Sequence, residues 1–185
     1  MPEREARNIY DAYHSSYTAL RGGYWAFVQA QLKSTRMLEN LFGRQIPFFG
    51  QWSDKLLHEA YSSIPQSTCG DLVNERGVIF AYFNRDPDFQ SVELLTQIHD
   101  SIEFQIPLST PPLVHARMLC SIRDSLEMPL EFNGHSFVVP VDLVVNSCLN
   151  KERGIEIKSR EFSRNPHELK DKLTFAWEEL KLNEP

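Results

Sequence analysis

A His-Asp pair at the tip of a predicted hairpin is the feature of this sequence whose residue types most directly suggest chemistry. His99, Asp100 and Ser101 stand between the apolar segment LLTQI and residues 102–106, which read IEFQI. The second segment alternates apolar and polar residues, as a strand with one buried face does. Two strands would fix a carboxylate and leave it open to a ligand, so Asp100 is a candidate magnesium ligand. Asp is also a common turn residue, and the local sequence alone favours that simpler interpretation.

The elements that must position this pair are predicted to be mainly helical. Apolar residues at helical spacing predict helices over residues 3–18, 24–36, 53–64, 66–83, 111–127 and 166–182. We expect Arg21-Gly22-Gly23 to break the chain between the first two helices. Pro65 should end or kink the third, because proline has no amide hydrogen and crowds the preceding turn. Asn165 and Pro166 are typical of the start of a helix.

The remaining segments predict strands. Residues 37–50 contain Gly43 and Pro47 and indicate a short extended excursion or hairpin. The apolar run at 137–145 predicts a further strand. Together the elements indicate an α+β fold with helices packed on a small antiparallel sheet and a hairpin at about 94–106. Without repeats or evident linkers, residues 1–185 are expected to form a single unit.

Length and composition narrow the class of protein. The chain has 185 residues, of which 42% are hydrophobic and 24% charged, as is usual for soluble globular proteins. No run approaches the ~20 apolar residues of a membrane helix, and the N-terminus is not a secretory signal. Three widely spaced cysteines fit buried thiols in a reducing compartment. We therefore expect a cytoplasmic protein with no membrane partner, or one in the host cytoplasm if a phage encodes it.

Charge is spread unevenly along the chain. The formal net charge of −6 disfavours a protein whose whole surface binds nucleic acid. No Lys or Arg occurs between Arg85 and Arg117, whereas Lys151–Lys172 is rich in basic residues. An acidic window suits cations and a basic tract could meet phosphate. A solvated face remains the simpler interpretation of each.

Three segments, taken in order, resemble motifs of the palm domain of family A DNA polymerases. ELLTQIHDSIEFQIP is similar to the third palm motif, in which a His-Asp pair joins two apolar strands. AYSSIPQSTCGDL resembles a helix in which Gln is followed by a small residue, Thr, two small residues and Asp. LENLFGRQIPFFG is similar to the family's Phe-Gly-Arg turn. The resemblance covers roughly residues 3–146.

The resemblance implies a role for each matching residue. Asp100 would be one of two aspartates that hold a pair of magnesium ions, and His99 would contact the primer terminus. Gln66 would contact the minor groove, whose acceptors are nearly independent of sequence. Thr68 belongs to the same motif, and Arg44 in the Gly-Arg turn would contact the DNA backbone. Magnesium, primer–template DNA and deoxynucleoside triphosphates are the implied cofactor and partners.

Several positions depart from the family pattern. Ser101 follows the His-Asp pair where the family often has an acid. His58 and Ser62 occupy the places, eight and four residues before the Gln, where the family commonly has Arg and Asn. They remain candidate DNA contacts with altered chemistry.

Two parts of the family's catalytic domain are absent from the sequence. The other metal-binding aspartate, in an Asp-Tyr-Ser strand, does not occur, and neither does the fingers helix whose Lys and Tyr meet the nucleotide. The resemblance thus implies part of a DNA-directed DNA polymerase that carries out two-metal nucleotidyl transfer in DNA replication. We expect the chain alone to be inactive and to need the missing N-terminal portion as a partner.

Two alternatives remain open. The chain could be a non-catalytic polymerase remnant, or a module that binds DNA or protein. It could also be an HD-type metal phosphohydrolase, which would use His58 and Asp142 together with the His-Asp pair. The alternating residues 102–106 speak against the second, because HD enzymes usually carry their ligands on helices.

Overall fold

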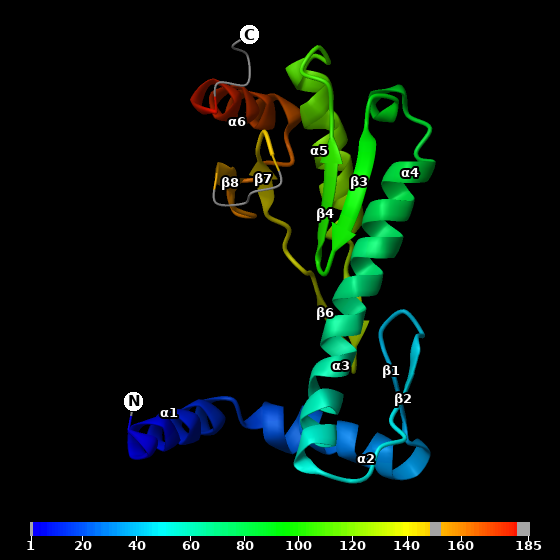
Figure 1. Cartoon of the computed structure of the whole chain (residues 1–185), viewed down its shortest axis with the longest axis vertical. Coiled ribbons are helices and arrows are strands. Elements are labelled where there is room, and N and C mark those ends of the chain that lie inside the picture. Colours follow the sequence, from blue (N-terminus) through cyan, green and yellow to red (C-terminus); the bar gives the residue numbers. More distant parts are fainter. Residues whose placement is uncertain (1, 149–152, 181–185) are drawn as a thin grey trace. The chain divides into compact units, whose positions relative to one another are not determined.

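The computed structural model describes residues 2–148 and 153–180 and has the expected α+β architecture (Figure 1). The residues cluster into two compact units, 1–68 and 69–185. The division falls inside helix α3, Asp54–Val73. Since a boundary within a helix does not by itself separate domains, the single unit stays a prediction.

The first unit consists of helices and one small hairpin. Its elements are α1 (Glu3–Ser16), the π-helical turn η1 (Leu20–Trp25), α2 (Ala26–Thr35), β1 (Met37–Glu39), β2 (Gln45–Pro47) and most of α3. β1 and β2 pair antiparallel, which confirms the hairpin expected around Gly43. The core is formed by α2, β1 and α3, with these fully buried or nearly buried residues: Val28, Leu32, Leu38, Leu56, Ala60 and Ile64.

The expected break at Arg21-Gly22-Gly23 is wrong. These residues lie in η1, whose π-helical turn continues directly into α2. Neither Gly22 nor Gly23 adopts a positive φ, so the pair does not act as a turn. A π-helical turn inserts extra backbone without ending the helix, and the flexible glycines tolerate it.

Pro65 does not end the helix, which is one of the two outcomes expected from the sequence, because α3 runs through it to Val73. Proline cannot donate to the carbonyl four residues earlier, so Tyr61 O is left without its helical partner. The Tyr24 hydroxyl donates to that carbonyl at 2.8 Å. A hydroxyl from η1 thereby replaces the missing amide. The Tyr61 ring also stacks on Trp25, with centroids 4.7 Å apart, and the Tyr61 hydroxyl accepts a hydrogen bond from the Gln29 side chain.

Tyr24→Phe is therefore expected to destabilise the chain by about 1–3 kcal/mol, because it leaves a half-buried carbonyl without a donor. Burial raises the pKa of Tyr24 to about 12. The unfolded chain ionises this phenol first, so wild-type stability should fall as the pH rises from about 10 toward 12. The variant should lack this alkaline component in denaturant titrations. The same loss of stability at alkaline pH in Tyr24→Phe and wild type would contradict the assignment. Tyr82→Phe, at an exposed tyrosine, serves as the control.

The second unit contains the remaining elements. After α3 come η2 (Asn74–Ile79), α4 (Phe80–Phe83), η3 (Pro87–Phe89), β3 (Glu93–Ile98), β4 (Ser101–Gln105), α5 (Pro112–Leu126), β5 (Leu130–Phe132), β6 (His135–Phe137), β7 (Leu143–Val145), β8 (Ile155–Ile157) and α6 (Pro166–Glu179). The helical stretch expected over 66–83 and the helix over 111–127 are confirmed. Each strand pairs antiparallel with its neighbour in sequence, so the described strands make only two-stranded sheets.

The single strand expected at 137–145 is wrong. Only its ends are strands: β6 ends at Phe137, and β7 begins at Leu143. Pro140 interrupts the run and cannot donate to a strand neighbour. β6 pairs with β5 and β7 with β8, so the apolar run joins two separate hairpins.

A buried carboxylate ties the C-terminal segment to α5. Glu127 accepts hydrogen bonds from Arg123 at 3.0 Å, from Arg164 at 2.9 Å and from the Val141 amide at 3.1 Å. Burial would raise the pKa of Glu127, but these hydrogen bonds outweigh it and hold the pKa below its ordinary value. α6 packs on α5 and begins with the expected cap, since Asn165 accepts from the His167 amide. Residues 153–180 are therefore part of this unit's structure.

No helix in the described ranges is both long enough and apolar enough to cross a lipid bilayer.

Candidate functional site

The His-Asp pair lies at the tip of a two-residue hairpin. Ile98 and Ser101 are the last paired residues of β3 and β4, which leaves His99 and Asp100 as the entire loop. Both side chains are exposed, as the sequence predicts for a tip open to a ligand. The Ser101 hydroxyl donates to Ile98 O at 2.9 Å and so closes the base of the turn.

His99 has a positive φ of 53°. Left-handed backbone costs a residue with a side chain roughly 1–2 kcal/mol, so glycine or asparagine would be the ordinary choice here. Backbone strain of this kind often occurs in functional turns. Here the strained residue is His99, one of the two residues that the sequence identifies as candidate functional residues.

The hairpin is held against the helical stretch η2 by close packing. A Cβ placed on Gly77 would lie 2.1 Å from Ile102 Cδ1 and 3.2 Å from Leu126 Cδ2. The missing side chain thus lets β4 approach the helix closely. On β3, the Gln97 side chain donates to Gly70 O at 3.4 Å. Both contacts fix the stem of the hairpin and leave its tip projecting.

The described residues do not by themselves fit a two-metal site. No three His, Cys, Asp or Glu side chains come together in the described ranges in a way that could hold a metal ion. Asp100 offers one carboxylate, whereas two magnesium ions held without substrate need several oxygen ligands. Any such site would need a carboxylate from elsewhere, and magnesium binding stays a prediction.

The nominated DNA contacts lie in the first unit. His58, Ser62 and Gln66 are four residues apart on α3, which places them along one face of the helix. His58 and Gln66 are exposed, and Ser62 is half-buried with its hydroxyl donating to Glu59 O. The spacing of these three residues along one face of α3 would allow contact with an elongated molecule such as duplex DNA. Their use in DNA binding stays a prediction.

Thr68 has a different environment from its three neighbours on α3. It is only 4% exposed, and its hydroxyl accepts a hydrogen bond from the Leu41 amide at 3.3 Å. It therefore joins α3 to the loop between β1 and β2, where Arg44 lies. Burial leaves Thr68 poorly placed to touch DNA directly and well placed to hold that loop. Arg44 itself is exposed.

The nominated residues thus form two sets. Arg44, His58, Ser62, Gln66 and Thr68 belong to residues 1–68, and His99 and Asp100 to residues 69–185. The two units also differ in charge.

The first unit carries seven Lys or Arg and six Asp or Glu. The second unit carries twelve Lys or Arg and nineteen Asp or Glu. The unit with the nominated DNA contacts is the less acidic of the two.

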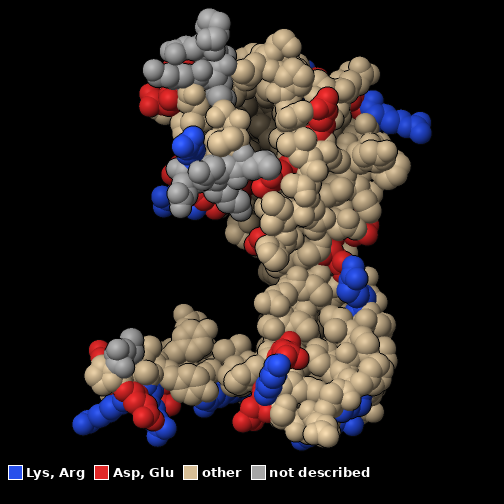
Figure 2. All heavy atoms as spheres, in the orientation of Figure 1, with Lys and Arg blue, Asp and Glu red and all other residues tan. Residues whose placement is uncertain are grey.

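The basic tract near the C-terminus is largely neutralised by acids. Lys158 pairs with Asp142 and Glu156, and Arg164 pairs with Asp124 and Glu127. On the face drawn in Figure 2, blue and red side chains are interspersed. A solvated, ion-paired surface therefore describes the tract better than a phosphate-binding patch; Lys151 lies outside the described residues.

The positions of His99, Asp100 and Asp142 do not fit the metal-ligand set of the phosphohydrolase alternative. His99 and Asp100 lie on a hairpin rather than a helix. Asp142 accepts from the Ser159 amide at 2.6 Å and from Lys158, and the first of these contacts is the main reason that the pKa of Asp142 is lowered. Its carboxylate is thus committed to the β7–β8 region.

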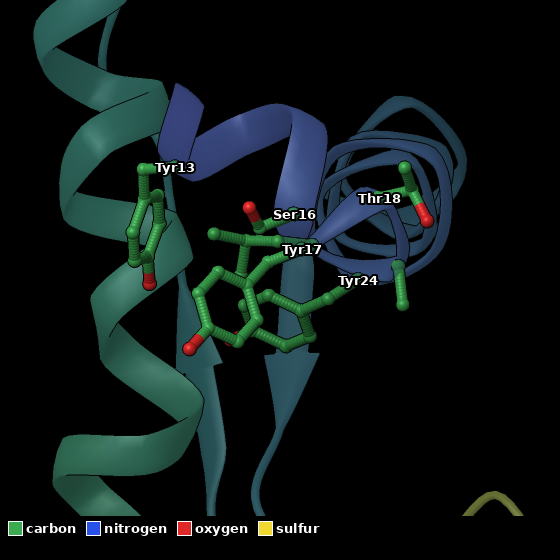
Figure 3. A pocket seen from close by; sticks show the side chains of 7 residues that line it. Tyr13, Ser16, Tyr17, Thr18 and Tyr24 are labelled. Carbon is green, nitrogen blue, oxygen red and sulfur yellow. The ribbon is translucent and has the colours of Figure 1, made fainter. Parts of the chain in front are cut away.

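A hollow of about 460 Å³ lies beside α1 and η1, lined in part by Tyr13, Tyr17 and Tyr24 (Figure 3). The Tyr13 and Tyr17 rings lie 4.8 Å apart at an angle of 43°. None of the nominated residues lines the hollow.

Sequence reasoning missed Asn40, which is 4% exposed and accepts hydrogen bonds from the amides of Phe42 and Arg44, each at 2.9 Å. An Asn two residues before the first bonded amide is the signature of an Asx turn, so a local signal existed. Nothing in the sequence marked the contact of Tyr24 with Tyr61, because its need arises only when the helix continues through Pro65.

No protein-family model, curated protein sequence or solved structure matches this chain.

Proposed function

We propose that this chain is the C-terminal palm portion of a family A DNA polymerase and takes part in template-directed, two-metal nucleotidyl transfer. The observation that carries the proposal is the hairpin tip. His99 and Asp100 make up its whole loop, His99 is held in a left-handed conformation, and both side chains are exposed. The resemblance to the third palm motif implies a His-Asp pair between two strands, which supports the proposal.

The roles follow the chemistry of each side chain. Asp100 supplies one carboxylate to the metal site, His99 meets the primer end, and Gln66 reads the minor groove from α3. Because the described residues hold too few ligands, the missing N-terminal portion of the polymerase would have to supply another aspartate and the nucleotide-binding helix. Primer–template DNA and deoxynucleoside triphosphates are the substrates.

The test is a primer-extension assay with the chain alone and with its complement. The complement is the missing N-terminal portion, a polypeptide that carries an Asp-Tyr-Ser strand and a Lys/Tyr fingers helix. We expect no extension by either chain alone and magnesium-dependent extension by the mixture. Extension by the chain alone would contradict the predicted inactivity. If no such complement is encoded, or if the mixture binds DNA without extending the primer, the chain is a remnant or a binding module.

A further inference from the structure

Asn40 is the centre of a small buried hydrogen-bond network around the Gly-Arg turn. Its side-chain oxygen accepts from the amides of Phe42 and Arg44, each at 2.9 Å. Its backbone amide donates to Arg44 O, and its backbone carbonyl accepts from the Gly43 amide, both at 3.1 Å. The path of the chain from residue 40 to residue 44 is therefore set largely by one side chain.

The same turn is attached to α3 by Thr68. The Thr68 hydroxyl accepts from the amide of Leu41, which lies inside the turn. Asn40 and Thr68 are each only 4% exposed, so water cannot readily replace these bonds. Figure 1 shows the β1–β2 hairpin running beside α3. The turn is thus fixed to the helix that carries Gln66, two residues before Thr68.

This geometry leaves Arg44 exposed on a turn whose backbone is fixed from both sides. Gly43 adopts a φ of 81°, which only a residue without a side chain accepts readily. An arginine on a fixed turn recognises phosphate oxygens with less loss of freedom than one on a mobile loop. We propose that Asn40 and Thr68 are positioning residues that hold Arg44 for contact with a DNA phosphate beside the α3 surface. The inference rests on the proposed function.

The test measures affinity for a fluorescein-labelled primer–template duplex by anisotropy at several KCl concentrations, using the full chain. Arg44→Gln should weaken binding about fivefold and reduce the slope of log affinity against log salt by about one, as loss of one phosphate contact does. Asn40→Ala and Thr68→Val should give the same two changes. Lys33→Gln, which removes an exposed cation from α2, is the control and should change the slope less.

Conservative variants separate positioning from simple loss of structure. Thr68→Ser keeps the hydroxyl that accepts from Leu41 and should restore binding, while Asn40→Ser, a weaker acceptor for the same amides, should restore it in part. Exchange of the Phe42 and Arg44 amides should quicken in Asn40→Ala. Combining Asn40→Ala with Arg44→Gln should add little to either change alone, because both act on one contact.

The outcomes distinguish this inference from the proposed function. If wild type binds no duplex at any salt concentration, both fall together. If wild type binds and Arg44→Gln weakens it, but Asn40→Ala and Thr68→Val match wild type in affinity and slope, only the positioning role is overturned. That role is likewise overturned if Thr68→Ser binds as poorly as Thr68→Val.

Discussion

Replacing Asp100 with Asn is expected to abolish nucleotide addition by the complex of this chain with its complement. The change removes the carboxylate charge that would hold magnesium at the hairpin tip and keeps the size of the side chain. A loss of at least ~10³-fold in kcat, equivalent to about 4 kcal/mol, is expected in single-nucleotide extension. The exposed position of Asp100 means that the fold should be unaffected.

The matched control is Glu131→Gln, which removes an exposed carboxylate from β5 in the same unit. Its extension rate should equal that of wild type. Asp100→Asn should also bind primer–template DNA with nearly unchanged affinity, since the residues nominated for the DNA backbone and the minor groove lie within residues 1–68 and His99 is unchanged. Full activity in Asp100→Asn would remove this residue from the metal site and with it the main argument for a polymerase palm.

Glu127→Ala is expected to cause a large loss of stability in the second unit. It leaves Arg123, whose side chain is 11% exposed, without its carboxylate, and leaves the Val141 amide without an acceptor. Removing one partner of a buried ion pair typically costs 3–5 kcal/mol. We expect about 3 kcal/mol, the lower end, because Arg123 also donates to Ser159 O and Arg164 reaches solvent. Denaturant unfolding measures the change.

The pH dependence gives a second check on Glu127. Its pKa in the folded chain lies below the ordinary value, so the unfolded chain takes up this proton first as the pH falls. The stabilisation is complete above the ordinary pKa of glutamate and is lost as the pH falls through the lowered value. Glu127→Gln should remove this acid-dependent part of the free energy of unfolding. Glu178→Gln, on the exposed side of α6, is the control and should retain it. The same dependence of stability on pH in wild type and Glu127→Gln would contradict the network.

Sequence patterns correctly predicted those strands, helix caps and turns that are determined by neighbouring residues. The alternation after Asp100, the cap at Asn165 and the turn at Gly43 each gave the right element, because neighbouring residues decide such structures. The errors at Gly22-Gly23 and Pro65 have the opposite origin. There, contacts with distant residues outweigh the local preference, and the Tyr24 hydroxyl is the clearest case.

The candidate site divides in the same way. The hairpin tip could be placed from the sequence, since two strands and a two-residue loop define it. The inward position of Thr68 and its hydrogen bond with the Leu41 amide could not be predicted from the sequence. Helical spacing alone does not say which face of a helix a loop covers. The packing of Ile102 on Gly77 was equally hidden, as it joins residues from separate elements.

The hydrogen bond between Tyr24 and Tyr61 O also bears on the order of events during folding. Helices usually form from contacts a few residues apart, within about a microsecond. Around Pro65 this is not sufficient, because the donor that completes α3 comes from 37 residues earlier in the chain. The middle of α3 therefore gains this hydrogen bond only once η1 has docked against it. Closure of this long loop makes formation of a helix, ordinarily a local process, depend on tertiary assembly.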